Sequence, residues 1–139
     1  MFEIRPAQRE DIPFWKTLDS HLPESELLLK IGEKRCYIIS DGSTPAGVMR
    51  YNLFWDLIPF LTLIYMDCAH RGKGLGRKAM AHWEGQMRLL GHKKVMTSTM
   101  VDEGAQHFYR KLGYADCGCL VNPFEPLAEA MEMFMAKQL

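Results

Sequence analysis

The stretch LTLIYMDCAHRGKGLGRK, residues 61–78, decides the fold. An apolar run ends at Met66, a basic glycine-rich segment follows, and a helical pattern begins at once. Apolar runs with β-branched and aromatic members are typical of strands buried on both faces. The alternating glycines leave the backbone open to a ligand, and a helix start presents free N–H groups to an anion. We call residues 70–78 the glycine loop and predict that it binds a phosphate group, most simply a pyrophosphate. Its relevant residues are Gly72, Gly74, Gly76, His70, Arg71, Lys73, Arg77 and Lys78.

Length and charge limit the classes of partner. The chain has 139 residues, enough for one domain with a core, and we expect a single domain over 1–139. Seventeen basic and seventeen acidic residues cancel. Nucleic acids and anionic membranes usually attract proteins with a basic excess, so we expect neither as the main partner. A local basic cluster in a neutral chain suits a small anionic ligand.

The cysteines and the apolar runs indicate a cytoplasmic protein. The beginning of the chain, MFEIR, does not resemble a signal peptide, and no apolar run approaches the ~20 residues of a membrane span. The four cysteines match no disulfide scaffold, so reduced thiols are expected. They are Cys36, Cys68, Cys117 and Cys119, and with five scattered histidines they predict no metal site.

Periodicity predicts alternating strands and helices. Helices are expected after Asp11 (as N-cap), from Pro23 to a stop at Gly32, from the glycine loop to Gly91, and from Asp102 (as N-cap) to Gly113. Strands are expected at 2–5, 37–39, 48–55, 61–66, 94–100, 115–121 and 131–139, with turns at 41–45 and 56–59 and a loop at 122–127. The expected buried positions are Ala79, Met80, Trp83, Met87 and Leu90 in the third helix, and Ala105, Phe108 and Leu112 in the fourth.

This order predicts the fold class. Hairpin-linked strands come early and strand–helix–strand crossovers come late, which implies an α/β protein with a mixed, mostly antiparallel sheet covered by helices on both faces. The strands 61–66 and 94–100, joined through a helix, are expected to be parallel neighbours.

Spacing excludes two common phosphate loops and favours a third. No glycine is followed by Lys and then Ser or Thr, as a Walker A loop requires, and G-x-G-x-G replaces the dinucleotide G-x-G-x-x-G. The pattern Arg71-x-x-Gly74-x-Gly76 instead resembles the Q/R-x-x-G-x-G/A acetyl-CoA loop of GNAT-type N-acetyltransferases. Residues 105–114, AQHFYRKLGY, resemble the second signature of that family. The resemblance covers nearly the whole chain, and it implies about seven strands flanked by four helices.

The resemblance also implies how acetyl-CoA is bound. The backbone of residues 65–68 would bind pantetheine, and the N–H groups of residues 73–77 would bind the pyrophosphate. Asp102 stands where the family usually has asparagine, and an aspartate cannot donate an amide N–H to pantetheine. The implied cofactor-binding residues are Tyr65, Met66, Asp67, Cys68, Arg71, Gly72, Lys73, Gly74, Leu75, Gly76, Arg77, Asp102, Phe108 and Tyr109.

The implied reaction is direct attack of an amine on the thioester, which needs a neutral amine, an oxyanion donor and a proton for the thiolate. By resemblance, a backbone N–H near Met66–Asp67 is the oxyanion donor and Tyr109 is the acid; the alternative for Tyr109 is a core tyrosine beside Phe108. Asp67 is a candidate base, although a water chain or a purely capping role is an alternative. An acyl-enzyme at Cys68 is disfavoured because no His–carboxylate pair is evident.

The acceptor site is expected in the first two helices and the hairpin. Its candidates are Glu26, Phe54, Trp55 and Asp56, which would suit a cationic amine. Alternatively, Phe54 and Trp55 pack on Phe14 or Trp15. The expected activity is acetylation of a small-molecule or peptide amine, and the alternative is a non-catalytic acyl-CoA-binding or sensor module. A homodimer is also an open alternative, since dimers are frequent in the family.

Overall fold

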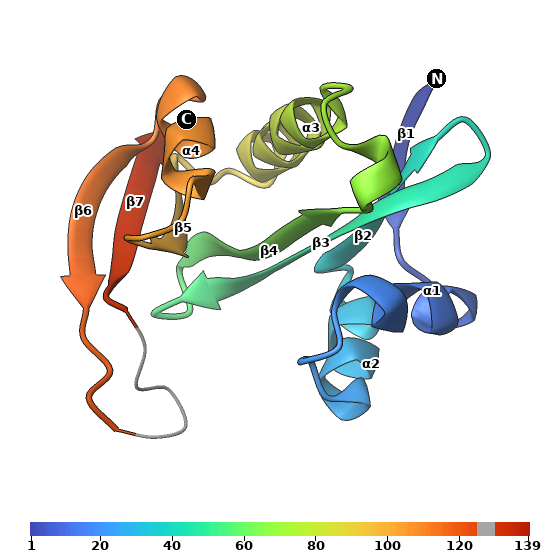
Figure 1. The fold of residues 1–139 in the computed structure, drawn as a ribbon, viewed down its shortest axis with the longest axis horizontal. Coiled ribbons are helices and arrows are strands. Elements are labelled where there is room, and N and C mark those ends of the chain that lie inside the picture. The colour runs from blue at the N-terminus through green and yellow to red at the C-terminus, as the bar shows by residue number, and fades with distance from the viewer. Residues whose placement is uncertain (125–129) are drawn as a thin grey trace. The chain divides into compact units, whose positions relative to one another are not determined.

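The protein is built around a mixed sheet. The computed structural model describes residues 1–124 and 130–139, and in this part of the chain seven strands form one sheet in the order β1-β2-β3-β4-β5-β7-β6 (Figure 1). The pairs β1–β2, β2–β3, β5–β7 and β6–β7 are antiparallel. The elements are β1 (Phe2–Pro6), η1 (Arg9–Asp11), α1 (Ile12–Leu18), α2 (Glu24–Glu33), β2 (Cys36–Asp41), β3 (Thr44–Phe54), β4 (Ile58–Met66), η2 (Cys68–His70), α3 (Leu75–Leu89), β5 (Lys94–Met100), α4 (Ala105–Lys111), β6 (Ala115–Leu120) and β7 (Glu132–Gln138). The predicted fold class is confirmed; the predicted loop 122–127 lies partly outside the described residues.

The chain divides into two compact units. The first unit contains 1–52 and 61–86, and the second contains 53–60 and 87–139. Each of β3, β4 and α3 is therefore divided, with one end in the first unit and the other end in the second. In the described part of the chain, no helix is long and apolar enough to cross a membrane.

In the first unit, helices cover both faces of the strands (Figure 1). Ile38 of β2 is buried in a cluster with Trp15 of α1 and Leu27 of α2. Its neighbour Tyr37 faces the opposite way and contacts the His82 ring of α3 edge-on. This alternation follows from the period of two in a strand, and it confirms the two-sided packing predicted from the sequence for this unit.

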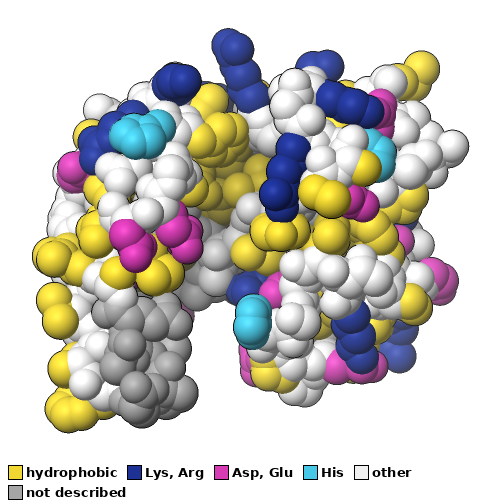
Figure 2. Space-filling model, in the orientation of Figure 1, with side chains coloured by type: hydrophobic (Ala, Val, Ile, Leu, Met, Phe, Trp, Pro, Cys, Tyr) yellow, Lys and Arg dark blue, Asp and Glu magenta, His cyan; other side chains and the backbone are white. Residues whose placement is uncertain are grey.

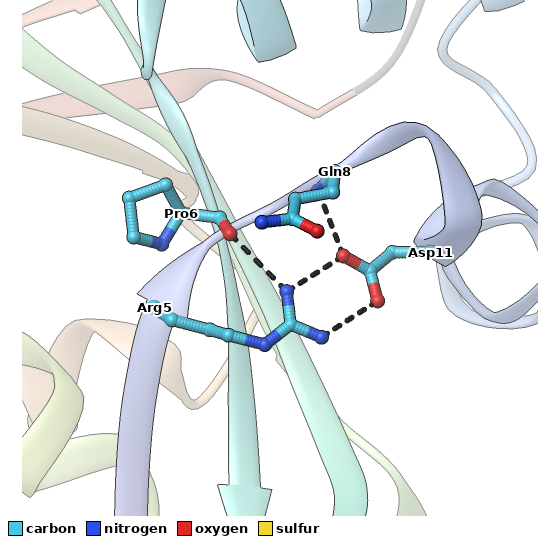
Figure 3. A network of polar contacts seen from close by, with 4 residues as sticks. All are labelled: Arg5, Pro6, Gln8 and Asp11. Carbon is cyan, nitrogen blue, oxygen red and sulfur yellow. Dashed lines mark hydrogen bonds and ion pairs between the residues drawn. The ribbon is translucent and has the colours of Figure 1, made fainter.

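Asp11 precedes α1 as predicted, but its carboxylate does not cap that helix. The carboxylate instead accepts two bonds from the Arg5 guanidinium, at 2.7 and 2.8 Å, and one from the Gln8 N–H at 2.7 Å (Figure 3). The hydrogen bond from Arg5 is the main cause that lowers the pKa of Asp11. Asp11 therefore joins β1 to η1, since a bidentate guanidinium is a stronger partner than a single helix amide.

Two predicted boundaries were wrong for reasons of backbone conformation. Helix α2 continues through Gly32 and ends where Lys34 adopts a left-handed conformation, with φ of 58°. The hairpin between β3 and β4 turns at residues 55–57, and Pro59 lies inside β4. Trp55 and Asp56 have φ of 54° and 58°, the conformation that two-residue hairpin turns require. The turn was predicted at 56–59 rather than at 55–57, because glycine and asparagine, the usual residues in this conformation, are absent from it.

The predicted buried side of α3 is confirmed except for its last position. Ala79, Met80, Trp83 and Met87 are buried, whereas Leu90 follows the end of the helix and is exposed. Because the helix stops at Leu89, position 90 no longer follows the helical period.

The N-terminus of α4 also differs from the prediction. Gly104 rather than Asp102 is the N-cap, and Asp102 lies in a turn that the Gln106 side chain supports by donating to the carbonyls of Val101 and Glu103. On the helix, Ala105 is exposed, and Phe108 and Leu112 are only partly buried. The buried residue of α4 is Tyr109.

Candidate functional site

The end of β4 leads into the tight turn η2. The carboxylate Oδ1 of Asp67 accepts the N–H of Ala69 at 3.0 Å, and so Asp67 caps this turn. This bond is the main cause that lowers the pKa of Asp67, and a hydrogen bond with the Cys68 side chain and the charge of Arg71 add to it. The N–H of Asp67 is also engaged, since it donates to the carbonyl of Ala46 in β3 at 2.7 Å.

The glycine loop fits an anionic group. Gly72 and Gly74 have φ of 75° and 77°, which side-chain-bearing residues rarely adopt, and no atom lies within 4 Å of the place where a Cβ would be. Helix α3 follows directly, and its first backbone bond runs from the N–H of Lys78 to the carbonyl of Gly74. The preceding amides of Leu75, Gly76 and Arg77 have no partner within the helix. An open backbone beside a helix N-terminus matches the chemistry of a pyrophosphate.

Arg71 fastens the loop to the strand before it. Its Nε donates to the carbonyl of Met66 at 3.1 Å, and its guanidinium carbon lies 5.0 Å from the centre of the Tyr65 ring. Arg71 thus contacts the strand end where pantetheine binding was expected.

The other cations of the loop are exposed. Lys73 lies 3.4 Å from the Asp41 carboxylate, which also pairs with the N-terminal amine. Exposed pairs of this kind are weak and exchange readily for a stronger partner. Arg77 is exposed, and Lys78 lies 5.9 Å from the Phe2 ring centre. Across the visible face, basic and acidic side chains are interspersed, as a net charge of zero suggests (Figure 2).

In the second unit, Tyr109 is a buried phenol. Only 6% of the residue is exposed, and its ring contacts those of Phe108 and Tyr114 at centroid distances of 5.3 and 5.7 Å. Desolvation raises the pKa of Tyr109, while a hydrogen bond with the Thr97 side chain in β5 opposes that shift. Tyr109 therefore keeps its proton throughout the neutral range. Asp102 is an exposed turn residue in this unit.

The residues expected around the acceptor belong to different compact units, with Glu26 in the first and Phe54, Trp55 and Asp56 in the second. Glu26 is exposed in the first turn of α2. The Phe54 ring contacts those of Trp55, Phe60 and Phe134 at 4.7, 5.9 and 6.3 Å, whereas Phe14 and Trp15 belong to the core cluster of the first unit. Phe54 therefore belongs to an aromatic cluster of the second unit, and Phe14 and Trp15 belong to the core of the first. Trp55 is 76% exposed, and Asp56 is exposed beside it.

The structure gathers residues 65–77 within the first unit and the pair Phe108 and Tyr109 within the second. Two contacts of the first group were missed from the sequence, those of Ala46 and Gly47 in β3 with the end of β4. An isolated glycine inside a strand is the available signal for such a close approach. The strand was expected to begin at Val48, which left Gly47 outside it.

Comparisons with known proteins agree with these observations. No curated protein sequence matches the chain significantly. Among solved structures, the chain is similar to Ard1 from Thermoplasma volcanium, with a TM-score of 0.87, 16% identity and coverage of 99% of this chain and 97% of that one. It is also similar to the ribosomal-protein-S18-alanine N-acetyltransferase from Escherichia coli, with a TM-score of 0.81, 18% identity and coverage of 99% of this chain and 94% of that one. A third similar structure is Arabidopsis thaliana Naa50 in complex with the bisubstrate analogue CoA-Ac-MVNAL, with a TM-score of 0.82, 11% identity and coverage of 99% of each chain.

These likenesses show the fold, and the family rests on the sequence itself. The profile of the acetyltransferase (GNAT) family matches residues 2–114, which include the glycine loop and the AQHFYRKLGY signature. The chain belongs to the GNAT acetyltransferase family.

Proposed function

We propose that this protein is an N-acetyltransferase that transfers the acetyl group of acetyl-CoA to a primary amine of a peptide or small molecule, by direct attack in a ternary complex. The single observation that carries the proposal is the open, left-handed glycine loop at the start of α3, in a chain of the GNAT family. Acetyl-CoA is the cofactor, and it supplies the thioester that the amine attacks. We further propose that the protein works in the cytoplasm, where its exposed thiols stay reduced.

Two groups of residues would bind the cofactor. The amides at the start of α3 and the exposed cations of the glycine loop would bind the pyrophosphate, and the backbone at the end of β4 would bind pantetheine. Binding of this kind supplies affinity and places the acetyl group for attack. The proposed contacts are Tyr65, Met66, Asp67, Cys68, Arg71, Gly72, Lys73, Gly74, Leu75, Gly76 and Arg77, together with Asp102, Phe108 and Tyr109.

The proposed oxyanion donor is the N–H of Met66. The neighbouring N–H of Asp67 already donates to Ala46 at 2.7 Å. Of the two amides expected in this role, Met66 is therefore the better candidate. A backbone donor aimed at the developing oxyanion contributes more in the transition state than in the ground state.

Tyr109 is the proposed general acid. Its raised pKa keeps the phenol protonated at neutral pH, so that a proton is present when the thiolate leaves. The ordinary pKa values of a phenol, about 10, and of a thiol, about 8.5, make this transfer only mildly unfavourable. Burial adds to the cost, and the hydrogen bond with Thr97 reduces it.

The proposed base is Asp67, and a water chain is the alternative. A carboxylate with a lowered pKa is a weaker base, although it is ionised over the whole neutral range. An amine whose pKa is near 10 must lose a proton in either case.

A peptide amine is the first acceptor to test. Two of the structurally similar proteins have names that refer to a ribosomal protein alanine and to a peptide-bearing bisubstrate analogue. The proposed acceptor-lining residues are Glu26, Phe54, Trp55 and Asp56, whose carboxylates and rings would attract a cationic amine. These residues would suit the amino group of a peptide as well as that of a small molecule.

A thiol-release assay tests the proposal. Acetyl-CoA is mixed with the enzyme and with peptides, amino acids, polyamines and other small amines in turn, and free CoA is measured. At least one acceptor should give release that depends on enzyme. CoA binding without release from any acceptor would favour the non-catalytic alternative, and failure to bind CoA would overturn the proposal.

Tyr109→Phe tests the acid. We expect kcat to fall by at least about 100-fold while CoA affinity stays within about twofold. Tyr114→Phe is the matched control, because it removes a hydroxyl from a second buried tyrosine in the same ring cluster. A Tyr109→Phe enzyme with full kcat between pH 6 and 9 would show that Tyr109 has only a packing role.

A further inference from the structure

Gly47 of β3 lies against the end of β4 more closely than any other residue type would allow. A Cβ at this position would lie 2.5 Å from the sulfur of Met66, 2.9 Å from its terminal carbon and 2.9 Å from the carbonyl oxygen of Tyr65. Carbon atoms do not approach other heavy atoms to 2.5 Å without displacement. Glycine is needed here because of its neighbours, since position 47 has no left-handed backbone conformation.

A bulge beside Gly47 makes a second contact with the same strand end. Ile39 of β2 pairs with Gly47, whereas the next residue, Ser40, pairs with Pro45, which leaves Ala46 as the extra residue. Such bulges re-aim local backbone groups. The carbonyl of Ala46 accepts the N–H of Asp67 at 2.7 Å, and Ala46 itself is fully buried.

Arg71 also contacts this strand end. Its Nε donates to the carbonyl of Met66, and its guanidinium stacks on the Tyr65 ring. The backbone of Tyr65, Met66 and Asp67 is thus fixed by β3 and by the glycine loop together. All of these residues belong to the first compact unit.

We propose that Gly47 is a positioning residue for acetyl-CoA: its missing side chain lets Met66 lie against β3 and sets the backbone that binds pantetheine and the thioester carbonyl. This inference rests on the proposed function, because it concerns the same backbone groups. A side chain at position 47 must push either the Met66 side chain or the Tyr65 carbonyl away. The displacement would move the proposed oxyanion donor, and small displacements at a reacting centre have large effects on rate.

Gly47→Ala is the direct test, and Gly85→Ala is its control. Gly85 lies within α3, and a Cβ there meets no atom within 4 Å. We expect Gly47→Ala to weaken CoA binding by at least about tenfold by calorimetry and to raise the KM for acetyl-CoA, with the KM for the amine unchanged. Gly85→Ala should leave all three constants unchanged.

Met66→Ala separates positioning from a general loss of folding. Removing the Met66 sulfur and terminal carbon relieves two of the three close contacts, so Gly47→Ala should cost less CoA affinity in a Met66→Ala background than in the native chain. The contact with the carbonyl oxygen of Tyr65, at 2.9 Å, remains in the double variant. If Gly47→Ala alone does not fold, the comparison of Met66→Ala with the double variant therefore decides: weaker CoA binding by the double variant supports the proposal, and equal binding overturns it.

The two hypotheses fail differently. If the native protein binds no CoA, the proposed function is wrong. If the native protein binds CoA and a folded Gly47→Ala variant binds it equally well, with the same KM for acetyl-CoA, then only the role of Gly47 is wrong.

Discussion

The carboxylate of Asp67 combines two roles that a single substitution can separate. One oxygen caps η2 through the N–H of Ala69, and this bond lowers the pKa of the group. Asparagine retains an oxygen that can accept the same N–H but cannot take up a proton at neutral pH. Asp67→Asn therefore preserves the cap and removes the base.

We expect Asp67→Asn to lower kcat by about 100-fold with little change in CoA affinity. In the native enzyme, a base with a lowered pKa is deprotonated above that pKa, so kcat should not fall between about pH 8 and pH 5 through protonation of Asp67. Any rise of kcat with pH in that window would come from the acceptor amine. A variant that keeps its kcat would leave Asp67 with the cap alone and would favour the water chain.

At the scale of residues, the sequence predicted those positions whose role depends on the conformation of their own backbone. Gly72 and Gly74 were singled out as positions that leave the backbone open, and both are left-handed with open space beside them. Tyr109 has the burial and the contact with Phe108 that its alternative as a core tyrosine implies, and burial alone does not decide between that role and the acid. Gly47 was missed because its contacts come from residues nearly twenty positions away in the sequence.

At the scale of elements, α1 is attached to β3 through a buried charge. Asp19, directly after α1, accepts bonds from the Trp15 indole at 3.1 Å and from Nε of Arg50 at 2.8 Å. The side chains of Asp19 and Arg50 are only 3% and 14% exposed. Removing one partner of such a pair leaves a buried charge uncompensated.

We expect Arg50→Met to lower the free energy of unfolding by about 3 kcal/mol, measured by urea denaturation at pH 7. Adding Asp19→Asn to Arg50→Met should restore part of this loss, because no buried charge then remains. Lys16→Met, which breaks an exposed pair with Glu24, should cost under about 1 kcal/mol. Equal losses in Arg50→Met and Lys16→Met would contradict the role assigned to burial.

The presence of the strands and helices was predictable because their periodic patterns are long. The residues at which they begin and end were harder to predict. Each predicted helix and strand is present in the described part of the chain. The ends depend on local contacts and backbone conformation: Arg5 removes Asp11 from its expected cap, and α2 continues past Gly32 until Lys34 adopts a left-handed conformation and ends it. Neither effect is visible in hydrophobic periodicity.

At the scale of the whole molecule, the chain has no net charge but carries a local cluster of cations in the glycine loop, and binding of CoA there should stabilise the fold. A ligand that binds only the folded state stabilises it by about 2.7 kcal/mol at 100 times its Kd. For a chain of this size, CoA at that concentration should raise the melting temperature by roughly 5–15 °C.

The glycine loop gives this prediction a matched pair of variants. Alanine at Gly74 would be forced into a left-handed conformation, at a cost of about 1–2 kcal/mol, or would distort the loop. Gly74→Ala should therefore melt lower than the native protein without ligand and lose most of the CoA-dependent rise. Gly85→Ala, in the interior of α3, should keep the full rise and melt slightly higher, because alanine favours the helix by about 1 kcal/mol. A Gly74→Ala variant with an undiminished rise would place the CoA phosphates away from the glycine loop, and with them the attachment of the cofactor to α3.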